Sequence, residues 1–164
     1  MKHMRTFFVA GTLAAAMLCG ALAGCAPGDA SGERGFEVRV YESDQTRVLL
    51  RVMETEDNKS MYDALVALQE DGRLTFDGSE STYGFYITSV NGVAATSENY
   101  WGVYTTLGMY EGVSYSDATW GTIEYSDTLG NTYTLASASY GASGLPLVRG
   151  EWYALARTAV ESDA

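Results

Sequence analysis

Apolar and polar positions alternate over much of the chain. The alternation is clear over 36–41, and a second β-like run follows over 47–53 after the turn residues Ser43 and Asp44. A period of two is typical of strands that bury one face. The pattern therefore predicts that the folded domain opens with a β-hairpin.

A longer period replaces this alternation after residue 58. Met61, Leu65 and Leu68 recur at the spacing of one helix face, Ser60 precedes them as a fitting N-cap, and Gly72 is placed for the C-cap. We expect one main helix that covers a face of the sheet. The next segment, 77–81, is rich in turn residues and carboxylates; it is expected to be a solvated loop rather than a calcium loop, because its spacing matches no known set of ligands.

The strongest strand signals come next. Segments 83–90 and 100–104 are rich in aromatic and β-branched residues, and the first ends at Asn91-Gly92, a dipeptide that tolerates positive φ. We expect the two segments to pair as a hairpin, with Asn91-Gly92 starting a wider connection over 93–99.

Two further strand features complete the pattern. Segments 122–126 and 132–138 bracket the turn-rich 127–131 and predict a second hairpin, and 151–157 predicts a closing strand. In the closing strand, even-numbered Trp152, Ala154 and Ala156 share one face, and the odd-numbered residues share the other. The predicted fold class is α+β: a β-rich, grasp-like or two-sheet domain with one main helix.

The first 24 residues differ from this domain. A basic start is followed by an apolar run over 7–18 and then by Leu-Ala-Gly-Cys, which predicts a lipoprotein signal peptide with Cys25 as the lipidated residue; an ordinary secretory signal is the alternative. Residues 25–34 are expected to form the lipidated, flexible tether, 35–158 the domain and 159–164 a tail. The predicted location is extracytoplasmic, on the bacterial cell membrane through a lipid anchor.

Cleavage would leave 164 − 24 = 140 residues with a formal charge of (10 − 2) − 21 = −13. Such a charge disfavours a nucleic-acid partner. The mature chain would have no histidine and no free thiol, so catalytic triads and Cys/His metal sites lack their residues, and we expect neither an enzyme nor a metal site. An enzymatic alternative is glycoside hydrolysis by a carboxylate pair such as Glu124 with Asp127, but exposed acids on an acidic protein explain this pair more simply.

Tyrosine and tryptophan are concentrated between residues 83 and 140, among Gly, Ser and Thr. This composition is typical of adaptable recognition surfaces, and also of ordinary β-sheets. We select five candidate ligand-binding residues: Tyr100, Trp101, Tyr104, Trp120 and Tyr140. Because residues of equal parity share a strand face, Tyr100 and Tyr104 are expected on the binding face and Trp101 in the core.

The segment 84–92, followed by Tyr100-Trp101, resembles the core of the transcobalamin-like C-terminal domain family, over about 48–155; the turn Arg149-Gly150-Glu151 departs from the family pattern. The resemblance implies that cobalamin, or a similar large planar corrinoid, is bound near the aromatic pair. No covalently bound cofactor is expected. The primary hypothesis is a membrane-anchored lipoprotein that captures such a ligand and passes it to a membrane importer. The alternative is a cell-surface module that binds protein or glycan.

Overall fold

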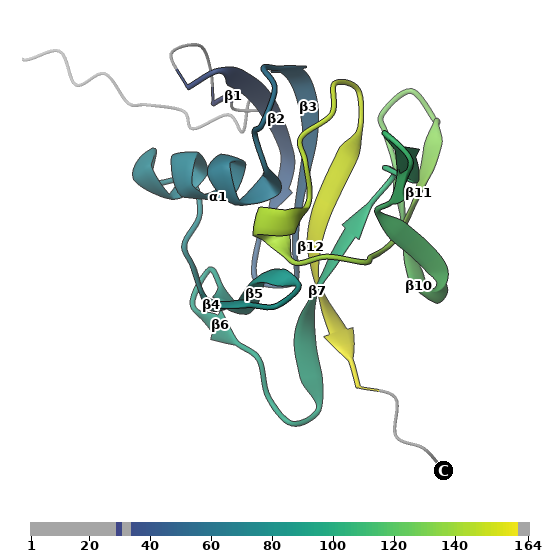
Figure 1. Cartoon of the computed structure of the whole chain (residues 1–164). Coiled ribbons are helices and arrows are strands. Elements are labelled where there is room, and N and C mark those ends of the chain that lie inside the picture. Colours follow the sequence, from purple (N-terminus) through teal and green to yellow (C-terminus); the bar gives the residue numbers. More distant parts are fainter. Residues whose placement is uncertain (1–28, 31–33, 161–164) are drawn as a thin grey trace, which may run out of the picture.

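The computed structural model describes residues 29–30 and 34–160, so the predicted signal peptide and Cys25 lie outside the described residues. The described chain is β-rich, with one α-helix and several sheets, and this confirms the coarse fold class (Figure 1). Within the described residues, no helix has the length and apolar character needed to cross a membrane.

Antiparallel strands form one large sheet. Its strand order is β1-β2-β3-β12-β7-β11-β10, so the last strand of the chain lies at the centre. The strands are β1 (Asp29–Ala30), β2 (Phe36–Ser43), β3 (Arg47–Thr55), β12 (Trp152–Ala159), β7 (Asn99–Thr105), β11 (Thr132–Ala138) and β10 (Ser116–Ser126).

Smaller elements lie around this sheet. In Figure 1 the α-helix and the three-stranded sheet lie to the left of β12, and β11 and β10, which end the large sheet, lie to the right. The elements are α1 (Met61–Glu70), the sheet of β4 (Phe76–Ser81), β5 (Gly84–Val90) and β6 (Val93–Ala94), the ribbon of β8 (Met109–Tyr110) and β9 (Val113–Ser114), and the 3₁₀ turn η1 (Ala142–Gly144).

Local sequence signals explain where α1 begins and ends. Ser60 caps the helix by accepting a hydrogen bond from the Asp63 backbone, and the Asp63 carboxylate accepts one in return from the Ser60 backbone. The C-cap residue is Asp71, and Gly72 follows it with a φ of 68°. The predicted helix and its N-cap are confirmed, and Gly72 takes the left-handed conformation immediately after the C-cap residue.

The large sheet has an apolar cluster on each face, and β12 contributes to both. Tyr153 and Leu155 belong to the main core with α1 and β5, whereas Trp152, Ala154 and Ala156 belong to a second cluster. This division confirms the predicted alternation in the closing strand. The opening hairpin of β2 with β3 and the later hairpin of β10 with β11 are also confirmed.

The second cluster is covered because the large sheet curls upon itself. In a flat sheet, β2 and β10 would be separated by five strand spacings of about 4.8 Å each. Instead, the rings of Tyr41 and Tyr125 are 6.0 Å apart, and Arg47 donates a hydrogen bond of 3.0 Å to the Glu124 carbonyl. Side chains from the distant strands thereby enclose Trp152 without any backbone pairing between β10 and β2.

The predicted pairing of segments 83–90 and 100–104 is wrong. β5 pairs with β4 and β6, and β7 lies in the large sheet between β12 and β11. Asn91-Gly92 does not start a wide hairpin connection, because Val90 pairs directly with Val93 across a two-residue turn. The dipeptide joins β5 to a short strand that the sequence pattern did not reveal.

Two loop predictions also need correction. Segment 77–81 is part of β4, which pairs with β5 even though most of its residues are exposed. In the predicted flexible tether, Asp29 and Ala30 pair with Arg39 and Val38 of β2. The folded structure therefore begins before residue 35.

Candidate functional site

The five aromatic residues selected from the sequence do not form one site. Tyr100, Trp101 and Tyr140 line a pocket of about 270 Å³ between β5, β7 and segment 137–141, which runs from the end of β11 towards η1. Tyr104 and Trp120 do not line this pocket. The structure therefore brings three of the five predicted residues together.

Trp101 and Tyr104 are both buried, although they lie on opposite faces of β7. Trp101 is 1% exposed and its indole nitrogen donates a 2.8 Å hydrogen bond to the Val93 carbonyl, as expected for a core residue. Tyr104 is 3% exposed, within the second cluster, and its hydroxyl lies 2.8 Å from the Thr158 hydroxyl. The predicted exposure of Tyr104 is therefore wrong, because the curled sheet covers the face to which it points.

Trp120 lies in a segment that leaves the sheet. Asp117 pairs with Ser137 and Thr122 pairs with Ala136, so four residues of β10 are looped out between them. The Trp120 side chain is 63% exposed there. It lines neither of the two pockets considered as sites.

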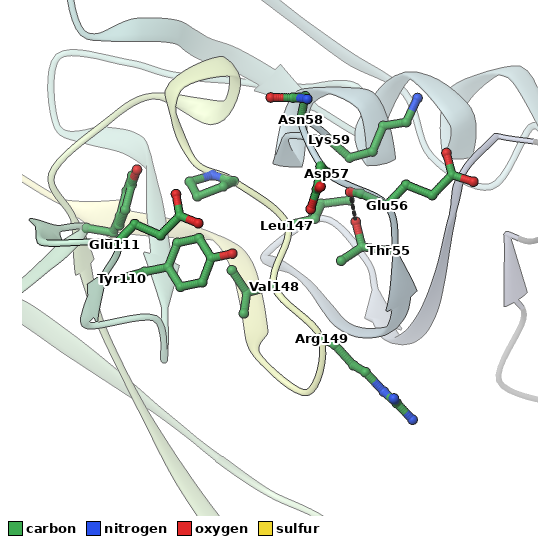
Figure 2. A pocket seen from close by; sticks show the side chains of 12 residues that line it. Thr55, Glu56, Asp57, Asn58, Lys59, Tyr110, Glu111, Leu147, Val148 and Arg149 are labelled. Atoms are coloured by element: carbon green, nitrogen blue, oxygen red, sulfur yellow. Dashed lines mark hydrogen bonds between the residues drawn. The ribbon is translucent and has the colours of Figure 1, made fainter.

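A larger cleft of about 660 Å³ lies elsewhere on the molecule (Figure 2). One wall is the loop 55–59 between β3 and α1, the opposite wall is the β8–β9 ribbon with Tyr115, and segment 146–149 forms the floor. This volume is in the range of small-molecule sites. The cleft is therefore the main candidate binding site.

The floor and one wall are tied to the core by backbone and phenol hydrogen bonds. The Leu147 amide donates to the Lys59 carbonyl at 2.8 Å. Below them, the buried Tyr153 hydroxyl donates to the Pro146 carbonyl at 2.7 Å and accepts from the Val148 amide at 2.9 Å. Burial raises the pKa of the Tyr153 hydroxyl, and the charge of nearby Glu151 raises it further, so this phenol stays protonated and holds the floor in place.

The turn of the β8–β9 ribbon places a carboxylate at the cleft. Tyr110 pairs with Val113, so Glu111 and Gly112 are the two turn residues, with φ values of 49° and 82°. Positive φ at both positions defines a type I′ turn, in which Asn, Asp and Gly are preferred. A glutamate at the first position costs roughly 1–2 kcal/mol of backbone strain.

Strained backbone recurs on the opposite wall. Of the three non-glycine residues with positive φ in the described chain, two line this cleft: Asn58 and Glu111. Strain of this kind is concentrated at functional sites. The presence of strained residues on both walls supports the cleft as the candidate functional site.

The charged side chains of the cleft differ in direction. In Figure 2, Tyr110 and Glu111 extend towards the floor from one side and Asp57 lies at the other side, whereas Lys59 and Arg149 point away. Arg149 forms an ion pair of 3.0 Å with Glu54. Neither the Glu111 nor the Asp57 carboxylate has a hydrogen-bond or ion-pair partner among the described residues.

A row of tyrosine rings connects the cleft with the smaller pocket. Tyr110 and Tyr115 line the cleft with ring centroids 6.5 Å apart, and Tyr115 lies 5.5 Å from Tyr140, which lines the pocket. All three rings are half-buried, so they are held in place and still present surface. This tyrosine row therefore extends from the cleft to the smaller pocket.

Sequence reasoning missed Asp57, Tyr110 and Glu111. The signal available was the dipeptide Glu111-Gly112 between Tyr110 and Val113, which is the pattern of a two-residue hairpin turn with an unusual first residue. Over residues 29–30 and 34–160, no three acidic, cysteine or histidine side chains gather as they would around a metal ion.

Comparison with known proteins finds no matching family model, no matching curated protein and no matching solved structure. Function is therefore inferred from the geometry of the cleft and of the tyrosine row.

Proposed function

We propose that this protein is an extracytoplasmic, lipid-anchored binding module that holds a ligand in the cleft between loop 55–59 and the β8–β9 ribbon. The observation that carries the proposal is Glu111, whose carboxylate is directed to the cleft from a turn position that disfavours glutamate. Such strain without a structural contact favours a binding role over a folding role.

The surroundings of Glu111 support binding rather than catalysis. The cleft offers half-buried tyrosine rings, free carboxylates and a hydrogen-bonded floor. Ligand sites of this size combine fixed apolar surface with a few polar groups that orient the ligand. No catalytic step is proposed.

The corrinoid implied by the resemblance and the predicted grasp-like arrangement of the fold both stay predictions. Among the residues proposed for the corrinoid, Tyr100 and Tyr140 retain partial exposure beside the smaller pocket. A corrinoid is larger than either hollow, so it would have to span the tyrosine row. The cleft itself favours a smaller ligand, or one end of a protein or glycan partner.

The binding proposal is tested by isothermal titration calorimetry on the full chain in detergent, against corrinoids, haem, oligosaccharides and small amines. Tryptophan fluorescence is unsuitable for this cleft because none of its lining residues is a tryptophan. We expect at least one ligand whose affinity falls about tenfold in Tyr110→Ala. Binding that is equal in the parent and in Tyr110→Ala for every ligand, or no binding at all, would contradict the proposal.

The anchor is tested separately by Cys25→Ser. The negative net charge of the chain opposes adsorption to anionic lipid, so the variant should leave the membrane fraction. If Cys25→Ser still sediments with membranes, the lipid anchor is not what holds the protein there.

A further inference from the structure

We propose that the ligand of this cleft carries an organic cation, an alkylammonium or guanidinium group, which is seated between the tyrosine rings and the two free carboxylates. This inference rests on the proposed binding function and adds the chemical class of the ligand. Nothing about the cation is needed for the cleft to be a binding site.

Charge is the first argument. Glu111 and Asp57 face the cleft from opposite walls without a partner among the described residues. A neutral ligand that covered them would strip water from two carboxylates without replacing their hydrogen bonds, which is costly. A bound cation would instead form charge-assisted hydrogen bonds with them, and an anion would be repelled.

The cations near the cleft do not satisfy these carboxylates. The Lys59 side chain passes beside Gly35, where its Cε lies 3.0 Å from the point at which a Cβ on that glycine would sit. It also lines a separate groove on the outer side of α1, together with Arg34 and Asp63. Lys59 and Arg149 also line the cleft, but Arg149 is paired with Glu54, and neither side chain forms an ion pair with Glu111 or Asp57 among the described residues. A cationic ligand would supply the partner that these two carboxylates lack.

The tyrosine rings give the second argument. Tyr110 and Tyr115 stand at 52° to each other, so the two rings form an open angle rather than a stacked pair. Aromatic faces attract ammonium and guanidinium groups, and more strongly so when the cation is partly desolvated. Rings and carboxylates together select a cation that has an apolar body.

Size excludes a bare metal ion as the intended ligand. A volume of about 660 Å³ far exceeds one ion, and within the described part of the chain no set of three acidic residues is placed to coordinate one. Hard divalent cations need six or more oxygen ligands or retained waters. An organic cation fills the space and uses the rings.

Matched probes test the inference. We would titrate the full chain in detergent with choline, with spermidine and with 3,3-dimethylbutan-1-ol, which has the shape of choline without its charge, and follow binding by ligand-observed NMR. Choline or spermidine should bind about tenfold more tightly than the alcohol. Added salt should lower the affinity of the two cations and leave that of the neutral alcohol unchanged.

Variants locate the effect. Glu111→Gln keeps the size of the side chain and should weaken cation binding about tenfold, whereas Glu98→Gln, a carboxylate outside the cleft, should leave it unchanged. The proposal of a cationic ligand would be overturned by any of three results: equal affinity for choline and the alcohol, no binding of either cation, or an unchanged cation affinity in Glu111→Gln. If a neutral ligand binds the parent protein and no longer binds Tyr110→Ala, the proposal of a cationic ligand is overturned, but the proposed binding function is supported.

Discussion

Two turns of this molecule share one backbone geometry and differ in what their first side chain does. Asn91-Gly92 joins β5 to β6 with φ values of 48° and 79°, and Glu111-Gly112 joins β8 to β9 with 49° and 82°. Both have the positive φ angles of a type I′ turn. The first carries the residue that this turn prefers, and the second does not.

The contacts of the two side chains explain the difference. The Asn91 amide group donates to the Asp44 carbonyl at 2.8 Å and accepts from the Thr75 amide at 3.1 Å, so it connects three segments of the fold. The Glu111 carboxylate makes no such contact with the described residues and is directed to the cleft. One strained position therefore serves the fold, and the other presents a charge to the cleft.

The largest effect is expected at Trp101, whose indole holds the Val93 carbonyl beside the Asn91-Gly92 turn. Trp101→Ala should lower the free energy of unfolding by about 3–5 kcal/mol, because it removes a buried ring and its hydrogen bond. Urea denaturation measures the change, with exposed Trp120→Ala as the control. A loss below about 1 kcal/mol would show that the structural turn is less firmly anchored than its contacts imply.

Asn91→Ala should cost about 2 kcal/mol of unfolding free energy, because the Thr75 amide and the Asp44 carbonyl lose their partner and alanine fits positive φ poorly. Thermal unfolding of the variant gives the value. Ligand affinity should be unchanged, since Asn91 lines neither hollow. A lower ligand affinity in Asn91→Ala would contradict the view that this turn supports the fold alone.

The two turn glycines give a matched pair. Gly92 and Gly112 have nearly equal φ, and nothing lies within 4 Å of the place where a Cβ would stand on either. Gly92→Ala and Gly112→Ala should each cost about 1 kcal/mol, through backbone strain alone. Costs that differ by more than about 1 kcal/mol would show that the two ribbons are not equivalent as scaffolds.

The smallest change in stability, and a gain, is expected for Glu111→Asn. Asparagine tolerates the left-handed region, so the variant should gain about 0.5 kcal/mol of unfolding free energy while it loses affinity for a cationic ligand. Differential scanning calorimetry and the choline titration measure the two effects. A destabilised Glu111→Asn would mean that the glutamate supports the fold after all.

Local sequence patterns predicted an element correctly where its own apolar positions, on one face of a strand or of a helix, are enough to define it. The alternation in 151–157 matched the two clusters of β12, and Ser60 marked the start of α1. These features depend on residues near in sequence or on a single strand.

Pairing and burial were harder to predict because they depend on distant segments. Nothing in 83–104 indicates that β7 joins β12 instead of β5, since both partners offer apolar faces. Tyr104 is covered because the large sheet curls and brings Tyr41 of β2 near Tyr125 of β10, over the same cluster. The cleft was missed for the same reason, because its walls come from segments about fifty residues apart and its floor from a third.

The central position of β12 determines when the protein can fold. β3 ends at Thr55 and β7 begins at Asn99, yet both find their common partner only in the strand that begins at Trp152. Until β12 is in place, β3 and β7 each have an unpaired strand edge, and both apolar clusters lack the side chains that β12 contributes. Folding therefore depends on contacts between residues far apart in sequence, which makes it slow. The fold is therefore completed only when the segment that begins at Trp152 is available.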